Sequence, residues 1–435
     1  MSKIDFSKED ILFIGNEQIN IDNDQFKTND SIDLQKIRKK IEPWLTTVFQ
    51  SEHLSLLVGT GLTIALAESG GFPNRINFEG KFNDKIKNKA DEEAQKFERG
   101  EANFEDDLRV AIELLKGLVI QNENEEANLL KKCINKELCN LIKSIIDAEK
   151  QFLSSIKNSN QNNQTVKTNK KNESKKSLNK LTLLTKFLLS FASRTASRDR
   201  LNIFTTNYDR IIEYGLDRAG LLTLDRFIGK INPIMRFHRI DLDYHYNPPG
   251  IRGEPRYVEG VVRYTKLHGS IDWKFEDKQI VKLPIAFGQD IRDYFESPLT
   301  NVVIYPNSSK AIETSYFPYS ELFRDFSTAI CRPNSVLVTY GYGFGDSHIN
   351  QIIIDMLTIP STHLVIISYD NASGRIEKFI KQCNESQLTL IIGSNLAELE
   401  TLVNYYLPKP TIDYITDRQV RIMEKRKILQ ETEDI

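Results

Sequence analysis

Short, continuous apolar runs that each end at a glycine or a group of polar residues recur along the chain and constrain its fold most. They are LSLLV (54–58), NIFTT (202–206), VVRYTKL (261–267), NVVIY (301–305), VLVTYG (336–341), LVIISY (364–369) and LTLII (388–392). Continuous rather than alternating runs are typical of strands whose two faces are both covered by helices. The pattern therefore predicts an α/β protein with a mostly parallel sheet.

The chain of 435 residues is long enough for one large domain with insertions, or for two domains. We expect an N-terminal helical segment (1–50), an α/β core (51–83 and 200–408), a helical insertion (84–199) and a C-terminal helical tail (409–435). Apolar residues at three- and four-residue spacing support the helices of the insertion. Within it, residues 154–180 hold seven lysines and one acid among Asn, Gln and Ser, which predicts a low-complexity, solvated loop.

Composition indicates no special partner. The 58 basic and 60 acidic residues leave a net charge of −2. The lysine-rich loop could contact nucleic acid but lacks interleaved aromatics and arginines, so we expect no direct nucleic-acid ligand. No apolar stretch approaches the about 20 residues that span a bilayer, and the first residues lack a signal-peptide core. We therefore expect a cytoplasmic protein without membrane contact, whose four scattered cysteines are reduced.

The sequence VGTGLT (58–63) is a strand end, a glycine turn and the start of a helix. Gly59 and Gly61 allow a tight turn, and Thr60 and Thr63 add hydroxyls. The amides of such a turn, together with the helix dipole, can receive a phosphate. An ordinary tight turn explains the same residues, and the spacing is not that of GxGxxG.

Two further strand ends carry polar side chains. TTNYD (205–209) contributes Thr206, Asn207 and Asp209, and KLHGS (266–270) contributes His268. The carboxyl ends of parallel strands are where α/β sheets bind ligands. An N-cap would explain one polar residue of TTNYD, but not four. A lone histidine is more often structural, although His268 stands at a strand end before Gly-Ser.

A third glycine-rich turn lies in TYGYGFGDSHIN (339–350), where Gly341, Gly343 and Gly345 allow close backbone approach. Asp346 or Ser347 is expected to cap the helix that follows. No second ligand stands at metal-site spacing from His348, for which a structural role is favoured.

Taken in this order, VGTGLT, FTTNYD, KLHGS and YGYGFGDSHIN resemble the sirtuin family, and particularly its bacterial NAD-hydrolysing branch in anti-phage defence. The resemblance covers about residues 50–72 and 200–395 and implies a Rossmann-like sirtuin fold. It implies the following roles: NAD phosphate binding by Gly59, Thr60, Gly61 and Thr63; the TQNxD motif beside the nicotinamide ribose at Thr206, Asn207 and Asp209; the catalytic histidine at His268; the turn over the adenosine at Gly341, Gly343 and Gly345; and the border of the adenine ribose at Ser368 and Asp370.

The chain departs from protein-deacylating sirtuins in two places. Their zinc module carries two CxxC pairs after the HG motif, whereas only Cys331 lies between His268 and Gly341. We therefore expect no metal. The family's GIPDFR-like loop, which closes over nicotinamide, is replaced by ESGGFPNR (68–75). Phe72 and Arg75 are candidates for a related role in this loop.

The resemblance implies an NAD+ glycohydrolase that releases nicotinamide and ADP-ribose and depletes NAD as the effector of an anti-phage system. Asn207 would position a water, His268 would act as base and Asp209 would hold the ribose or carboxamide. Because no Walker A sequence is present, a HerA-type ATPase would be a separate partner, and the helical segments are the expected surfaces of a homo-oligomer. Two alternatives remain: a deacylase or ADP-ribosyl transferase, and a non-enzymatic sensor of NAD or ADP-ribose.

Overall fold

The computed structural model describes residues 4–28, 31–67, 75–78, 82–96, 102–165, 179–194, 198–237, 243–246, 256–290, 294, 298, 302–304 and 318–409. The helices are α1 (Leu34–Phe49), α2 (Thr60–Ala67), α3 (Phe82–Lys96), α4 (Phe104–Ile120), α5 (Asn124–Thr165), α6 (Lys180–Ala192), α7 (Ile211–Arg218), α10 (Tyr319–Ile330), α11 (Ser347–Leu357), α12 (Arg375–Ile380), α13 (Ser394–Ala397) and α14 (Leu399–Thr401), with a π-helical turn at Leu402–Tyr406. The strands of the main sheet are β1 (Ile11–Ile14), β2 (Glu17–Ile19), β5 (His53–Val58), β6 (Leu201–Thr205), β7 (Leu222–Leu224), β12 (Val261–Lys266), β16 (Ser335–Tyr340), β17 (His363–Ser368) and β18 (Leu388–Ile392).

The main sheet has the strand order β2-β1-β18-β17-β16-β5-β6-β12-β7. Every pairing from β18 to β7 is parallel, and β1 and β2 add an antiparallel edge. The chain runs outward from β5 through β6 to β12, and later outward from β16 through β17 to β18. The order therefore reverses between β5 and β16, which is the switch point at which open α/β sheets bind ligands.

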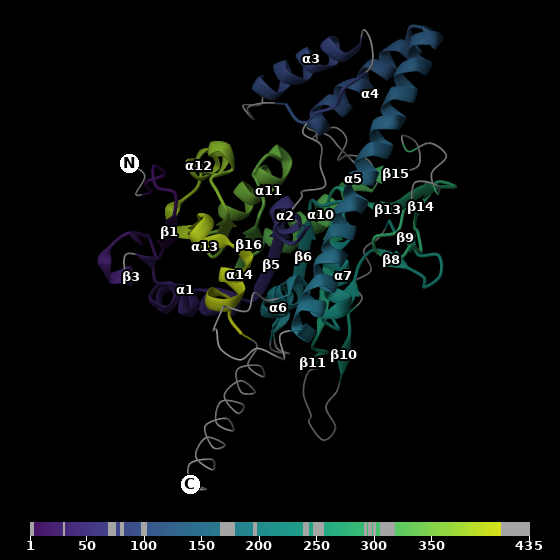
Figure 1. Ribbon diagram of the computed structural model, residues 1–435. Helices are drawn as coiled ribbons and strands as arrows, with labels where there is room; N and C mark the ends of the chain where they lie inside the picture. Colours follow the sequence, from purple (N-terminus) through teal and green to yellow (C-terminus); the bar gives the residue numbers. More distant parts are fainter. Residues whose placement is uncertain are drawn as a thin grey trace, which may run out of the picture.

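Helices cover both faces of this sheet (Figure 1). One apolar core joins the sheet to α1, α2, α6 and α7, and includes Phe187 and Leu216. The other joins it to α10, α11 and α12, and includes Phe326 and Ile353. Strands buried on both faces explain the continuous apolar runs in the sequence. The predicted α/β fold with a mostly parallel sheet is confirmed.

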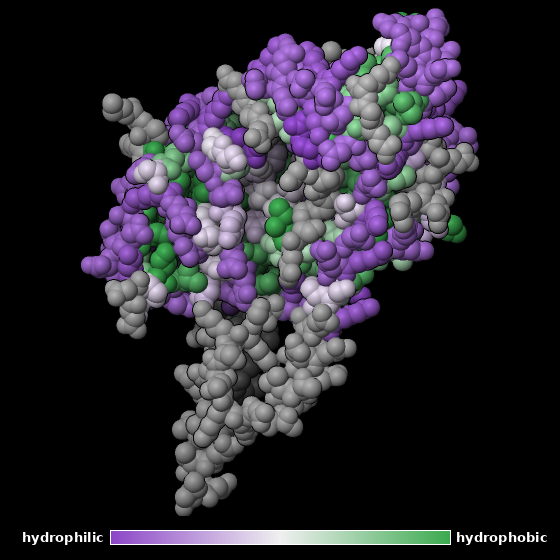
Figure 2. Space-filling view, turned by 45° about the horizontal axis from the view of Figure 1, so that its top comes forward, coloured by the Kyte–Doolittle hydropathy of each residue, from purple (hydrophilic) through white to green (hydrophobic). Residues whose placement is uncertain are grey.

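Helices α3, α4 and α5 form a helical unit beside the sheet, with an apolar core of its own (Figure 1). Asn103 begins α4 with a capping box, in which its side chain and that of Asp106 bond each other's backbone amides. The 42 residues of α5 extend about 63 Å at 1.5 Å per residue, so the helix reaches from this unit to α2 and α6. The surface of the unit is mostly hydrophilic (Figure 2).

A second, antiparallel sheet has the order β15-β13-β14-β9-β8 and follows the HG motif. Its strands are β8 (Phe227–Ile228), β9 (Ile234–Met235), β13 (Gly269–Glu276), β14 (Gln279–Lys282) and β15 (Val302–Ile304), and short pairs form at β3 (Lys27–Thr28) with β4 (Ser31–Ile32) and at β10 (His245–Tyr246) with β11 (Arg256–Tyr257). The run at 301–305 was expected among the strands of the α/β core, but its residues 302–304 pair with β13 in this second sheet.

Two other segments differ from expectation. The N-terminal 50 residues contain β1 and β2 as well as α1, because Ile11, Leu12 and Phe13 find a buried place against β18. The backbone of α5 stays helical to Thr165, since residues 154–165 contain no glycine or proline to end it. The rest of the expected loop at 166–178, Phe72 and the tail at 410–435 lie outside the described residues.

The cysteines are free thiols, as expected. In the described part of the chain, no helix combines the length and apolar character needed to cross a bilayer. Over the same part, no cluster of three or more His, Cys, Asp or Glu side chains is arranged to hold a metal ion.

Candidate functional site

Two glycine turns pack against each other at the switch point of the sheet. Gly59 N–H donates to Tyr340 O at 3.0 Å, and Gly61 N–H donates to Gly341 O at 3.1 Å. A methyl group on Gly341 would lie 2.6 Å from Gly61 Cα, and Gly341 has a φ of +60°. Only glycine fits such contacts. These three glycines therefore join the ends of β5 and β16 and fix where α2 begins.

Asn207 is held at the end of β6 by a buried network. Its Nδ2 donates to Gly59 O at 3.1 Å and to Thr63 Oγ1 at 3.0 Å, and its backbone N–H donates to Thr205 Oγ1 at 3.1 Å. Both amide hydrogens are therefore used, which orients the side chain. Its Oδ1 is buried and has no hydrogen-bond donor among the described residues. A buried acceptor of this kind calls for an incoming O–H or N–H group.

Asp209 extends the same network. Thr63 Oγ1 donates to Asp209 Oδ2 at 2.7 Å, and Ile211 N–H donates to Oδ1 at 3.0 Å, so the carboxylate also caps α7. Burial raises the pKa of Asp209, although Lys266 and Thr63 oppose the shift. Lys266 Nζ donates to Asp209 O, to Tyr208 O and to Glu213. The Asp209 side chain is thus a buried, hydrogen-bonded element of the loop.

His268 and Asp346 come together from different parts of the chain. His268 Nε2 lies 2.9 Å from Asp346 Oδ2, and both residues are buried. Asp346 Oδ1 meanwhile accepts from His348 N and Ile349 N at 3.0 and 3.3 Å, capping α11. Because a carboxylate only accepts, Nε2 carries the proton in this contact. Asp346 therefore fixes both the orientation and the tautomer of His268.

Asn207 and His268 stand at the same level on neighbouring strands. Thr205 of β6 pairs in register with Lys266 of β12, and each functional residue lies two positions further along its strand. Leu267 N–H donates to Thr205 O at 2.8 Å, which continues the pairing beyond the strands. Both residues thus follow the carboxyl ends of adjacent parallel strands.

The helical unit anchors both motifs. Tyr208 and Ile271 belong to the apolar core of α3, α4 and α5. The Tyr208 hydroxyl donates to Glu105 Oε1 of α4 at 3.1 Å, and the Tyr208 and His268 rings are 6.2 Å apart. Burial raises the pKa of Tyr208 well above its usual value, with Glu105 adding to the shift. The residue between Asn207 and Asp209 is therefore held by the insertion.

The other predicted residues surround the same edge. Thr60 begins α2, and Thr206 N–H donates to Val58 O. Arg375 Nε donates to Gly343 O at 2.7 Å, whereas a methyl group on Gly345 would meet nothing within 4 Å. Ser368 ends β17, and Asp370 Oδ1 accepts from Ala372 N at 2.7 Å. All thirteen predicted residues thus follow or begin elements at the carboxyl edge of the sheet.

Arg75 has a different environment from the one expected for a nicotinamide loop. Its Nε and Nη2 donate to Asp107 at 2.8 Å each, and its Nη1 donates to Asp91 at 2.8 Å. Asp107 is fully buried in α4. The Arg75 guanidinium is therefore committed to joining the chain after α2 to the helical unit.

Sequence reasoning missed the partner of His268 and the anchor of Asn207. Asp346 was expected only as one of two possible helix caps, and nothing in a sequence tells which strand end a cap also faces. Tyr208 and Lys266 were read as parts of their motifs without a role. The signal available was their position, since both lie within or beside the polar strand ends TTNYD and KLHGS.

The switch point of an open α/β sheet is where such folds bind ligands, and here it carries glycine turns and polar groups. Residues 201–388 match the family model of the SIR2-like domain, which contains Asn207, Asp209, His268, Asp346 and the second glycine turn. The match supports a sirtuin-like family and an NAD-related function, because SIR2-like domains use NAD. Among curated proteins, none matches this chain.

Proposed function

We propose that the protein is an NAD+ glycohydrolase that converts NAD+ and water to nicotinamide, ADP-ribose and a proton. The observation that carries the proposal is that Asn207, with its unused buried acceptor, and His268, held by a carboxylate, follow the ends of adjacent parallel strands. The SIR2-like match over the same residues supports NAD as the substrate.

Breaking the bond between nicotinamide and C1′ develops positive charge on the ribose, and a held water can then attack C1′. Asn207 Oδ1 would accept a hydrogen from that water and direct its lone pair to C1′. Holding reactants in this way can contribute on the order of 7 to 11 kcal/mol. His268 would take the proton through Nδ1, a contribution of about 10²- to 10⁴-fold. Asp209, whose carboxylate is bonded to Thr63 and to the start of α7, would hold the loop rather than the ribose or carboxamide.

Because the N–H groups of Gly59 and Gly61 are used between the two turns, the N-terminal end of α2 would face the NAD phosphates, and the Gly341–Gly345 turn, Ser368 and Asp370 would border the adenosine. Thr63 is committed to Asn207 and Asp209. It would therefore act by orienting them rather than by touching NAD.

We further propose that this activity depletes NAD in the cytoplasm as the effector of an anti-phage system, in a homo-oligomer that a HerA-type ATPase partner controls. No metal takes part in the proposed step. The helical unit, which holds Tyr208, is the surface through which assembly would reach the site.

The test is to incubate the purified chain with NAD, alone and with its partner, and to quantify nicotinamide and ADP-ribose by chromatography. Equal amounts of both products are expected. Nicotinamide with O-acetyl-ADP-ribose after addition of an acetyl-lysine peptide would instead establish acyl transfer. Tight NAD binding without product under either condition would establish a sensor.

A further inference from the structure

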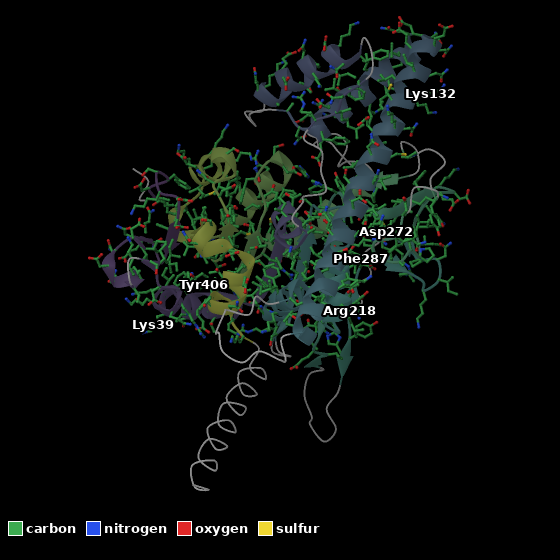
Figure 3. The ribbon with its side chains drawn as sticks, in the orientation of Figure 1. Lys39, Lys132, Arg218, Asp272, Phe287 and Tyr406 are labelled. Carbon is green, nitrogen blue, oxygen red and sulfur yellow. The ribbon has the colours of Figure 1, made fainter. Side chains whose placement is uncertain are left out.

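A cavity of about 570 Å³ lies between α7, the β13–β14 hairpin and residues 283–287. Its volume falls within the roughly 300 to 1,000 Å³ of small-molecule sites. Asp272 and Phe287, both labelled in Figure 3, line it from the hairpin and from the segment that follows β14. None of the thirteen predicted residues contributes to its wall.

One wall is a preorganised aromatic platform. The rings of Tyr214 and Phe287 are stacked, with centroids 4.6 Å apart and planes 19° apart. Phe152 of α5 meets both rings edge-on, at 6.1 and 6.3 Å. Pro284 and Ile285 add apolar surface beside them. Guanidinium groups already lie over both rings, with Arg210 Cζ 5.8 Å from the Phe287 centroid and Arg218 Cζ 5.1 Å from the Tyr214 centroid, so this wall suits flat cations.

The polar feature of the cavity is a buried carboxylate, one oxygen of which accepts no hydrogen bond from the described residues. Asp272 is only 2% exposed, and its Oδ1 has no hydrogen-bond donor among the described residues. Its backbone is fixed by Leu283 N–H, which donates to Asp272 O at 2.8 Å. Leaving a buried charged acceptor unpaired costs more than about 1 to 3 kcal/mol. An N–H donor placed in this cavity would remove that cost.

The neighbouring cations each make their hydrogen bonds or ion pairs with groups other than Asp272. Arg210 binds Glu149 with two nitrogens and donates to Ile285 O and Ala286 O. Lys266 donates to Glu213 at 3.1 Å. Lys282 lies 4.0 Å from Asp225. The charges of Arg210 and Glu149 neutralise each other. The carboxylates of Glu213, Asp225 and Asp272 then face two ammonium groups, those of Lys266 and Lys282.

The ionisation of Lys282 reflects the same imbalance. Burial opposes its charge, yet the surrounding carboxylates of Asp272, Glu213 and Asp225 raise its pKa above the usual value. At the rim, Asp217 and Lys230 have opposite charges and add nothing to the balance. When all these groups are ionised, the lining itself is neutral, with Arg210, Lys230 and Lys282 against Glu213, Asp217 and Asp272, and the carboxylates outnumber the cations by one only when Glu149, Asp225 and Lys266 outside the lining are counted.

We infer that this cavity binds a small organic monocation, whose guanidinium, amidinium or ammonium group donates to Asp272 while its flat or apolar part rests on Phe287. The Asp272 carboxylate selects against anions, and the aromatic wall selects against hydrated inorganic cations. The site goes beyond the proposed NAD chemistry, which uses neither residue.

Phenylguanidine is a suitable probe, with the neutral phenylurea and the anionic benzoate as matched compounds of similar shape. Isothermal titration calorimetry on the full chain should show phenylguanidine binding at least tenfold tighter than phenylurea, and no benzoate binding. Asp272→Asn should weaken phenylguanidine at least tenfold. Asp217→Asn, which removes the same charge at the rim of the same cavity, should leave its affinity within twofold.

Phe287→Ala tests the platform separately and is expected to weaken phenylguanidine about fivefold, so a failure of the Asp272 variant to fold leaves the inference testable. Equal binding of the three compounds, unchanged affinity in both variants, or no binding at all would overturn it. Displacement of phenylguanidine by ADP-ribose would assign the probe to the sheet edge and would also overturn it. None of these outcomes depends on whether NAD is hydrolysed.

Discussion

The substitution Asp346→Asn should keep the cap of α11 but change which ring nitrogen of His268 carries the proton. Asparagine caps helices about as well as aspartate, so its oxygen can still accept from His348 N and Ile349 N. Its amide group would then face His268 Nε2, where the carboxylate stood at 2.9 Å. Because an amide N–H donates, Nε2 would have to accept and Nδ1 would carry the proton. The nitrogen proposed as base would be blocked.

The size of the effect follows from the proposed chemistry. A general base contributes about 10²- to 10⁴-fold, which is about 2.7 to 5.4 kcal/mol of barrier at 1.36 kcal/mol per factor of ten. Stability should change much less, by about 1 kcal/mol or below, since the cap persists and one buried hydrogen bond replaces another. We therefore expect kcat for NAD hydrolysis to fall by at least 10²-fold while the melting temperature stays nearly constant.

Nicotinamide release and thermal unfolding are to be measured on the wild type and on the variant. Asp33→Asn is the matched control, because Asp33 caps α1 through Gln35 N and Lys36 N and does not belong to the sheet edge. It should leave kcat unchanged. Activity of Asp346→Asn within threefold of the wild type, with intact folding, would refute the assignment of His268 as a base fixed by Asp346.

Three further predictions concern the surroundings of the site. Gly341→Ala should destabilise the fold by at least about 2 kcal/mol in urea unfolding, because its φ is +60° and a methyl group would lie 2.6 Å from Gly61 Cα, whereas Gly345→Ala, with open space, should be nearly neutral. Tyr208→Phe should lower kcat about tenfold with little change in KM for NAD, because the hydroxyl holds the loop through the insertion; a change in KM alone would contradict this. Burial lowers the pKa of His363 to about 4 from 6.5. The neutral ring therefore contributes about 3 kcal/mol to the free energy of unfolding, which is fully present above pH 6.5 and is lost as the pH falls towards 4. His363→Gln should flatten the pH dependence of unfolding in this range, and an unchanged dependence would contradict the shift.

The parallel strands of the fold could be predicted because each can be recognised from its own residues alone. Runs such as LSLLV and LTLII are apolar on both faces and end where the sheet ends. The second sheet was not predictable, since the strand at 302–304 is short and its partner, Gly269–Glu276, follows directly on a strand of the first sheet. The antiparallel edge strand Ile11–Ile14 is equally short and depends on a partner at the far end of the chain.

The candidate site divides in the same way. The strand-end position of Asn207 and His268 follows from local sequence, and so does the expected turn at Gly59–Gly61. The contact of His268 with Asp346 joins residues 78 positions apart, and that of Tyr208 with Glu105 joins residues 103 apart. Such pairs depend on the strand order and on how the insertion packs, and neither can be inferred from a single sequence.

The central claim is that Asn207, at the end of β6, positions the water that attacks C1′ of NAD. It is tested most directly by comparing nicotinamide release from NAD in the wild type, in Asn207→Ala and in Asn202→Ala. Asn202 lies buried on the same strand, five residues from Asn207 and away from the carboxyl edge, so it controls for the loss of a buried amide. We expect Asn207→Ala to lose at least 10²-fold in kcat and Asn202→Ala to retain activity in its folded fraction. Undiminished release by folded Asn207→Ala would contradict the account.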